Sequence, residues 1–145
     1  MAVPLQCSNY PGYEIFNKMH GISSGVVIPP GSAILFTAGM VGPVADGGLE
    51  FSEDIEDQFQ KAFQNCEKAI RTAAPSLSAE DAWKSIVQIT SYHVGGVAEV
   101  DKPLAKVAGS FLRGHQPGWT AVTVPALGYP GCKFEFSVVV ALPPK

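Results

Sequence analysis

The sequence contains little charge, and arginine is especially rare. Only 16% of its 145 residues are charged, the formal net charge is −3, and Arg71 and Arg113 are the only arginines. The lysines are scattered from Lys18 to Lys145 rather than gathered in one stretch. Proteins that bind nucleic acid through its phosphates usually carry a stripe of clustered Lys and Arg. We therefore do not expect nucleic acid as a partner.

Cysteine and long apolar runs are also scarce. Cys7, Cys66 and Cys132 are odd in number and widely spaced, with no C-x-x-C pair, so neither a disulfide framework nor a zinc site is indicated. No apolar run approaches the ~20 residues of a membrane span. The N-terminal residues also lack the pattern of a signal peptide. These absences predict reduced thiols and a cytoplasmic protein with no membrane partner.

The histidines do not indicate a metal site. His20, His93 and His115 match no spacing that is typical of metal ligands, so no metal is expected. A lone histidine in a strand or loop usually has a structural role. His93 lies in an apolar strand-like run, from which it could reach a neighbouring cleft.

Apolar residues, by contrast, are plentiful. They make up 46% of the chain, and the mean hydropathy is +0.16. A chain of 145 residues can bury a sizeable core, and we expect one domain over residues 1–145. The apolar excess predicts that some of the surface is covered by self-association rather than by the chain's own fold.

The first half of the chain predicts two strands and a helix. Residues 1–20, with Pro and Gly, predict an irregular N-terminal arm. Strand-like runs at 22–28 and 33–41 flank the turn "PPGS", which favours a hairpin. An amphipathic helix should follow Ser52, a good N-cap residue, and end before Pro75.

The second half predicts a strand, a helix and two further strands. The run at 85–94 is apolar on parts of both faces, as in a central strand. A helix should begin near 101–103 and end at Gly114, and strands are expected at 119–124 and 133–142. The order β-β-α-β-α-β-β predicts an α+β protein with a single sheet and two helices on one face.

Glu135 is the one acidic residue in the last strand-like run, between Phe134 and Phe136. Strand alternation predicts that Trp119, Ala121, Glu135 and Val139 share the sheet face that the helices leave uncovered. Such a mixed but apolar face favours a subunit interface, with Glu135 in a cleft as an acid or base. The alternative is that Glu135 only binds a backbone amide or a lysine across that interface.

Several stretches together resemble the Rid superfamily, also called the YjgF/YER057c/UK114 family. These are "ILFTAGMVG", "DQFQKAFQNCEKAI", "IVQITSYHV" and "GWTAVTVPALGYPGCKFEFSVVVAL", while the arm "SNYPGYE" is similar to fungal-type members. The resemblance implies a chorismate-mutase-like fold and a homotrimeric barrel with small-molecule clefts between subunits. It also implies hydrolysis of enamine and imine acids to 2-keto acids and ammonia without a cofactor. Other members have been described as endoribonucleases or as binding modules.

The resemblance also implies where ligands bind. The family's glutamate on the last strand corresponds to Glu135, and its backbone ligand-binding strand to 37–40, around Ala38 and Gly39. A serine that lines the cleft falls at Ala38. A tyrosine from the first strand region falls near Ser23 or Ser24.

The arginine that clamps the substrate carboxylate in this family falls at Trp119, and a cysteine two residues later falls at Ala121. An indole carries no positive charge and cannot form a bidentate pair with a carboxylate. Lys133 or Arg113 could supply that charge instead, and strand alternation favours Lys133. Lys133 could equally be a solvated lysine or a salt-bridge partner of Glu135.

These expectations lead to three interpretations of function. The first is an enzyme that hydrolyses, deaminates or transfers a proton on an enamine or imine metabolite that is not a small carboxylate. The second is a trimeric binding module without chemistry, and the third is an endoribonuclease. A binding module differs from the enzyme in whether Glu135 faces an open cleft or is bound by protein neighbours. An endoribonuclease would need a basic track along which RNA binds.

Overall fold

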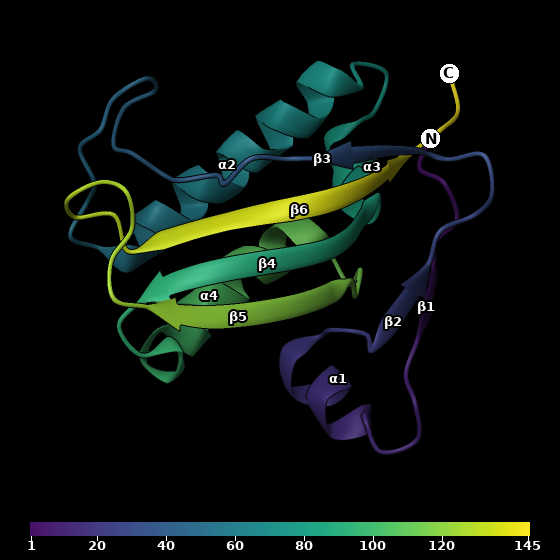
Figure 1. Ribbon diagram of the computed structural model, residues 1–145, viewed down its shortest axis with the longest axis horizontal. Coiled ribbons are helices and arrows are strands. Elements are labelled where there is room, and N and C mark those ends of the chain that lie inside the picture. Colours follow the sequence, from purple (N-terminus) through teal and green to yellow (C-terminus); the bar gives the residue numbers. More distant parts are fainter.

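A four-stranded sheet forms the centre of the structure, a computed structural model that describes residues 1–145 (Figure 1). Its strand order is β3-β6-β4-β5. The strands are β3 (Ala33–Phe36), β4 (Ile86–Val94), β5 (Gly118–Val124) and β6 (Phe134–Leu142). β6 is antiparallel to both of its neighbours, whereas β4 and β5 are parallel. The prediction that the strand at 85–94 is central is therefore confirmed.

The helices of the second layer all lie on one face of this sheet. They are α2 (Ile55–Ala73), α3 (Ala79–Lys84) and α4 (Val97–Leu112). Figure 1 shows α2 and α4 behind the sheet and no helix in front of it. The predicted α+β class, with its helices on one face, is confirmed. No helix combines the length and the apolar character that a membrane crossing requires.

Helix α2 forms where its apolar stripe predicts, but its cap differs from the expected one. Asp54 is the N-cap, and its Oδ1 accepts a hydrogen bond from the Glu56 N–H at 3.0 Å. Ser52 lies two residues earlier, where its hydroxyl accepts the Asp54 N–H and donates to Asp57. Both residue types are good N-caps, and the prediction of Ser52 rather than Asp54 as the cap is wrong.

Helix α4 begins at Val97, several residues before the expected start at 101–103. Proline favours the first turn of a helix, which made Pro103 a plausible start. Gly96 instead has extended backbone (φ −73°, ψ 126°) and serves as the N-cap. The helix ends at Leu112, and the C-cap residue Arg113 adopts the left-handed conformation with φ 50°, one residue before the expected Gly114.

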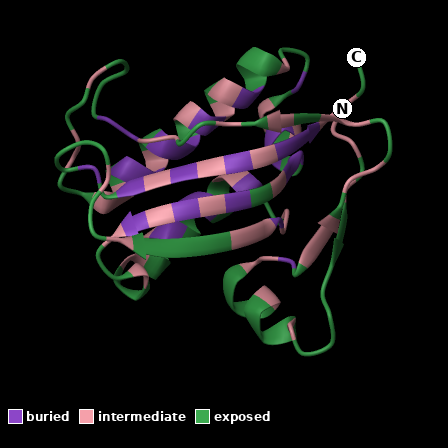
Figure 2. Cartoon of the chain, viewed as in Figure 1, coloured by how far each residue is buried: buried purple, intermediate pink, exposed green.

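The core lies between the sheet and the helices. Phe63 of α2 is central to it, because its ring centroid is 4.7 Å from that of Phe136, 5.4 Å from Trp83 and 5.5 Å from Phe111. Alternate residues of β4 and β6 are buried, and Figure 2 shows this alternation along both strands. The strands' buried residues are those that face α2 and α4.

The N-terminal region differs from its prediction. The expected hairpin of 22–28 with 33–41 is wrong, because β2 (Gly25–Val27) pairs with β1 (Gln6–Ser8), while β3 pairs with β6. The arm expected to be irregular also contains α1 (Glu14–His20). The two prolines of the turn lack N–H donors and interrupt a hairpin ladder. Figure 1 shows β1, β2 and α1 standing beside the sheet rather than within it.

Candidate functional site

Strand register places Glu135 on the uncovered face of the sheet. Residues that are Cα partners on neighbouring strands point to the same side. Glu135 is the partner of Tyr92, and Ser137 is the partner of Thr90. All four alternate with the buried residues that face the helices, so they point the other way.

Trp119 and Ala121 lie on the opposite face from Glu135. Trp119 is the partner of Ile89, and Ala121 is the partner of Ser91, and both Ile89 and Ser91 are buried on the helix side. The prediction that Trp119 and Ala121 share a face with Glu135 is therefore wrong. The prediction failed because it treated β5 as a neighbour of β6. β5 pairs with β4 instead, so Trp119 points to the same side as its partner Ile89.

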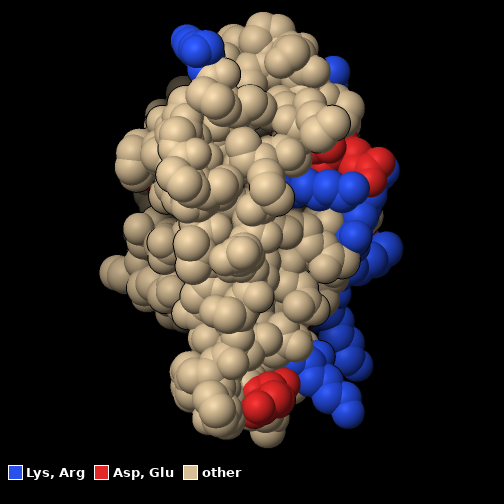
Figure 3. Space-filling view, turned by 90° about the vertical axis from the view of Figure 1, so that its right-hand side faces the viewer, with Lys and Arg blue, Asp and Glu red and all other residues tan.

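The uncovered face combines exposed apolar side chains with uncharged polar ones such as Thr90 and Ser137, and it carries one carboxylate. Phe36 is 73% exposed, Ile34 41% and Val122 38%. Glu135 is the only charged residue among the strand positions of this face. Figure 3 shows the molecule from the side that lies at the right of Figure 1, and in this view most charged side chains gather along one margin.

The side chain of Glu135 lies directly against Gly39. A bridge between Met40 and Phe136 brings the two segments together, with the Phe136 N–H donating to the Met40 carbonyl at 3.1 Å. A Cβ atom built on Gly39 would lie 2.6 Å from Cδ and 2.9 Å from Cγ of Glu135. Only glycine, which lacks a Cβ atom, leaves space here for the Glu135 side chain. The carboxylate rests on the backbone of Gly39 because that residue has no side chain.

The Glu135 carboxylate has no partner within the subunit. It accepts no hydrogen bond and forms no ion pair. Lys133, the predicted salt-bridge alternative, is exposed and uses its backbone N–H to bind Gln58 Oε1 at 2.9 Å. Arg113 pairs with Glu80 at 3.7 Å. Neither cation reaches Glu135, so the carboxylate is available to a molecule from outside the subunit.

The other predicted site residues divide between the two faces. Ala38 is exposed and adjoins Gly39, so the structure brings these two and Glu135 together. Ser23 is 3% exposed, and its hydroxyl donates to the Gln116 carbonyl at 2.6 Å, just before β5 begins. Glu135 is level with the far end of β5, so Ser23 lies at the other end of the sheet.

Trp119 belongs to a hydrogen-bonded chain on the helix side. Its indole N–H donates to Ser91 Oγ at 2.9 Å, and that hydroxyl lies 2.8 Å from Nε2 of His93. Burial lowers the pKa of His93, so the imidazole is neutral at pH 7. Its Nδ1 is buried without a partner. His93 therefore faces away from the Glu135 side, contrary to the interpretation in which it reaches that cleft.

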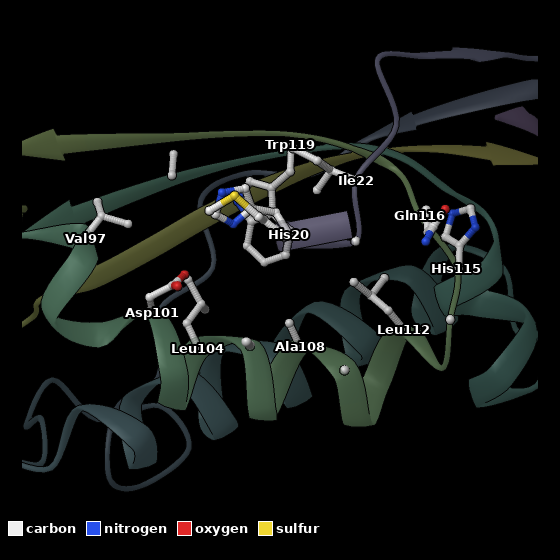
Figure 4. A pocket seen from close by; sticks show the side chains of 16 residues that line it. His20, Ile22, Val97, Asp101, Leu104, Ala108, Leu112, His115, Gln116 and Trp119 are labelled. Carbon is white, nitrogen blue, oxygen red and sulfur yellow. The ribbon is translucent and has the colours of Figure 1, made fainter. Parts of the chain in front are cut away.

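The helix side also contains a cavity that sequence analysis missed. Trp119, helix α4 and the end of α1 surround about 530 Å³ (Figure 4). Its walls come from segments nearly a hundred residues apart, and no local pattern indicated that they meet.

The thiols and the acidic groups offer no further chemistry. Burial raises the pKa of Cys66 to about 12, and burial together with the charge of Glu135 raises the pKa of Cys132. Thiols with raised pKa are poor nucleophiles. All three cysteines are free. No group of three or more His, Cys, Asp or Glu side chains is placed to hold a metal ion.

A half-covered sheet with a parallel β4–α4–β5 crossover defines a small α+β protein of the chorismate-mutase-like class. The profile of the family described as "Endoribonuclease L-PSP" matches residues 23–142. The chain therefore belongs to this family, which is also known as the Rid or YjgF/YER057c/UK114 family. The fungal-type subclass stays a prediction.

Solved structures of the family share the fold at low sequence identity. The chain is similar to YyfB of the Rid family from Yersinia pestis, with a TM-score of 0.79, 22% identity, and coverage of 95% of this chain and 98% of that one. It is also similar to Rv2704 of the YjgF/YER057c/UK114 family from Mycobacterium tuberculosis, with a TM-score of 0.61, 19% identity, and coverage of 96% of this chain and 100% of that one. For yeast Mmf1 the TM-score is 0.62 and the identity 13%, with coverage of 98% of each chain. A search of curated protein sequences gives no match.

Proposed function

We propose that three copies of this chain pack their uncovered sheet faces together, with Glu135 in clefts between the subunits. The observation that carries the proposal is the single unpaired carboxylate on an uncovered face that exposes Ile34, Phe36 and Val122. An exposed apolar patch of this kind is typical of an interface. A charge left unpaired in such an interface is costly, which favours a cleft where water or a ligand binds it.

The reaction that fits this site is hydrolysis of an imine or of the enamine that tautomerises to it. A water molecule attacks the carbon of the C=N bond while Glu135 accepts one of its protons, and the nitrogen takes up a proton from solvent to give a carbinolamine. Glu135 then returns its proton to the amine nitrogen. As the C–N bond breaks, the hydroxyl group gives its proton back to solvent, and a ketone and ammonia leave. Positioned acid–base groups typically accelerate such steps by about 10²–10⁴-fold.

The substrate class follows from what lies near Glu135. Neither Lys133 nor Arg113 contacts it, and the residue at the position of the family's arginine is Trp119 on the other face. A small carboxylate would therefore lack its clamp. Phe36 and Tyr92 lie on the Glu135 face instead. We expect an uncharged or bulkier imine, held by the backbone of Ala38 and Gly39.

The test compares two imines. The decay of 2-iminobutyrate, generated in situ by an amino-acid oxidase, and of benzophenone imine, which is uncharged, is measured with and without the trimeric protein. We expect acceleration of the uncharged imine above all, and a loss of about 100-fold in Glu135→Gln. Glu99→Gln, an exposed change on α4, is the control and should retain activity. Equal rates for wild type and Glu135→Gln would contradict the proposal.

The second candidate is a binding module without catalysis. The observation that favours it is the absence of any cation near Glu135, which leaves binding by the backbone and by apolar contacts. In that case neither imine is hydrolysed faster, but both still bind, and Glu135→Gln changes only affinity. An endoribonuclease ranks third, because the uncovered face carries no basic track. A cytoplasmic location stays a prediction.

A further inference from the structure

The cavity on the helix side of the sheet is separate from the Glu135 face. Its volume of about 530 Å³ falls within the roughly 300–1,000 Å³ of small-molecule sites. Figure 4 shows α4 along one wall, with Trp119 from β5 opposite it and His20 from α1 at the same side as Trp119. Glu135 points away from this space, since its Cα partners lie on the other face.

The N-terminal arm builds one wall of the cavity. Residues 19–22 line it, and they precede the region 23–142 that matches the family. Asn17 fixes this wall, because its Nδ2 donates to the Ile22 carbonyl and to Gln116 Oε1, both at 2.9 Å. Ser23 adds two hydrogen bonds to the same loop, at 2.6 and 3.0 Å. The cavity therefore depends on a segment outside the region that matches the family.

Most polar groups of the lining are already bonded to the protein. Nε2 of His115 lies 2.6 Å from the Ile86 carbonyl, and burial lowers the pKa of His115, so this ring is neutral at pH 7. Gln116 binds Asn17, and the indole N–H of Trp119 binds Ser91.

Two polar side chains of the lining have no partner. These are Asp101 of α4 and His20 of α1, which form no hydrogen bond through their side chains and no ion pair. Figure 4 shows the Asp101 carboxylate at the opposite end of the cavity from His115 and Gln116. No Lys or Arg lines the cavity, so Asp101 gives it a negative end.

We propose that this cavity binds a small organic cation with an aromatic or aliphatic body and a primary ammonium group. The ammonium binds the carboxylate of Asp101. The body contacts Trp119 and the apolar side of α4, where Leu104, Ala108 and Leu112 line the cavity. A carboxylate ligand is disfavoured because it would face Asp101, and no Lys or Arg of the lining offsets the repulsion.

Three probes of equal body test the charge preference. They are 2-phenylethylamine, 2-phenylethanol and 3-phenylpropanoate, whose binding is followed by calorimetry and by the fluorescence of the two tryptophans, of which only Trp119 lines the cavity. We expect the amine to bind about tenfold more tightly than the alcohol, as a charge-assisted hydrogen bond predicts, and the propanoate to bind most weakly. In Asp101→Asn the amine and the alcohol should bind equally. Binding of the amine that is undetectable, or unchanged in Asp101→Asn, would overturn the proposal.

Two variants on one helix locate the bound amine. Ala105 is exposed and lines the cavity, whereas Ala98 is exposed on the same helix outside the lining. Ala105→Trp should abolish binding of the amine, and Ala98→Trp should preserve it. Equal affinity in both variants would overturn the location.

The positioning role of the arm has its own test. Asn17→Ala should weaken the amine and the alcohol by the same factor, because it loosens a wall without changing the charge. A loss confined to the amine would overturn this role. Glu135→Gln should leave binding of the amine unchanged, so failure of this proposal and failure of the imine hydrolase are distinguishable.

Discussion

The two faces of the sheet both carry large apolar side chains but differ in how far the subunit covers them. On the helix side, Phe134 and Phe136 are 0% exposed and pack against α2. On the other side, Phe36 is 73% exposed and nothing in the subunit covers it. The first face is finished within one chain, whereas the second is left unfinished, and we propose that other copies of the chain complete it. The unpaired carboxylate of Glu135 lies on the unfinished face, and the small-molecule cavity lies on the finished side.

The largest effect should come from the finished face. Phe63→Ala removes the central ring of the core, and large-to-small changes of buried aromatics cost about 3–5 kcal/mol in the free energy of unfolding. Urea denaturation measures this loss. Phe36→Ala, compared at a protein concentration where the chain is monomeric, should cost less than about 0.5 kcal/mol. Equal losses in the free energy of unfolding at Phe63 and Phe36 would contradict the claim that only one face is buried within the subunit.

The next effect concerns association. Phe36→Glu places a charge in the proposed interface, and an uncompensated buried charge costs roughly 3 kcal/mol, or more than a hundredfold in affinity. Sedimentation should show a monomer with an unchanged circular dichroism spectrum. Leu49→Glu, at a loop position that is 61% exposed, is the control and should keep the assembly of the wild type. A Phe36→Glu protein that still assembles would contradict the proposed interface.

A smaller effect is expected where Gly39 meets Glu135. Gly39→Ala forces the carboxylate away, and crowding of this kind typically costs about 1–3 kcal/mol in the free energy of unfolding. The double variant Gly39→Ala/Glu135→Ala should recover most of the loss, because the clashing atoms are gone. Gly128→Ala is the control, since a Cβ there meets nothing within 4 Å. A double variant as unstable as the single one would mean that the two residues are not in contact.

The smallest effect is a dependence of stability on pH that arises on the finished side. Burial lowers the pKa of His93 and His115 below the ordinary value of 6.5. The unfolded chain therefore takes up protons first as the pH falls, so stability is full above about 6.5 and decreases as the pH drops through 6.5 toward the folded pKa. Urea midpoints from about pH 8 to about pH 5 test this. Replacing both histidines with Gln should reduce the decrease, and an unreduced decrease would assign it to other groups.

Local patterns predicted the elements of this fold better than their pairing. The apolar stripe of α2 and the two-sided apolar run of β4 are local signals, and both elements form where they were expected. The face of Trp119 depends on β4 lying between β5 and β6, which no pattern within β5 reveals. The partner of β2 is likewise a distant segment, β1. For the same reason the cavity beside Trp119 could not be foreseen, since α1 and α4 meet there only in the folded chain.

The candidate site was predicted in part. The strand run and the family resemblance singled out Glu135, and the structure places Gly39 and Ala38 beside it. The prediction that Trp119 shares a face with Glu135 was wrong because alternation was counted on β5 as if it adjoined β6. The role of Glu135 in a reaction remains a proposal.

The mass of the wild-type protein in solution tests most directly whether the uncovered face is completed by other copies. Sedimentation equilibrium at micromolar concentration compares it with the 15.3 kDa of one chain. Our account predicts three times that mass, with Phe36 protected from solvent in the assembly. A stable monomer would contradict it, because the apolar face and the Glu135 carboxylate would then both remain open to water.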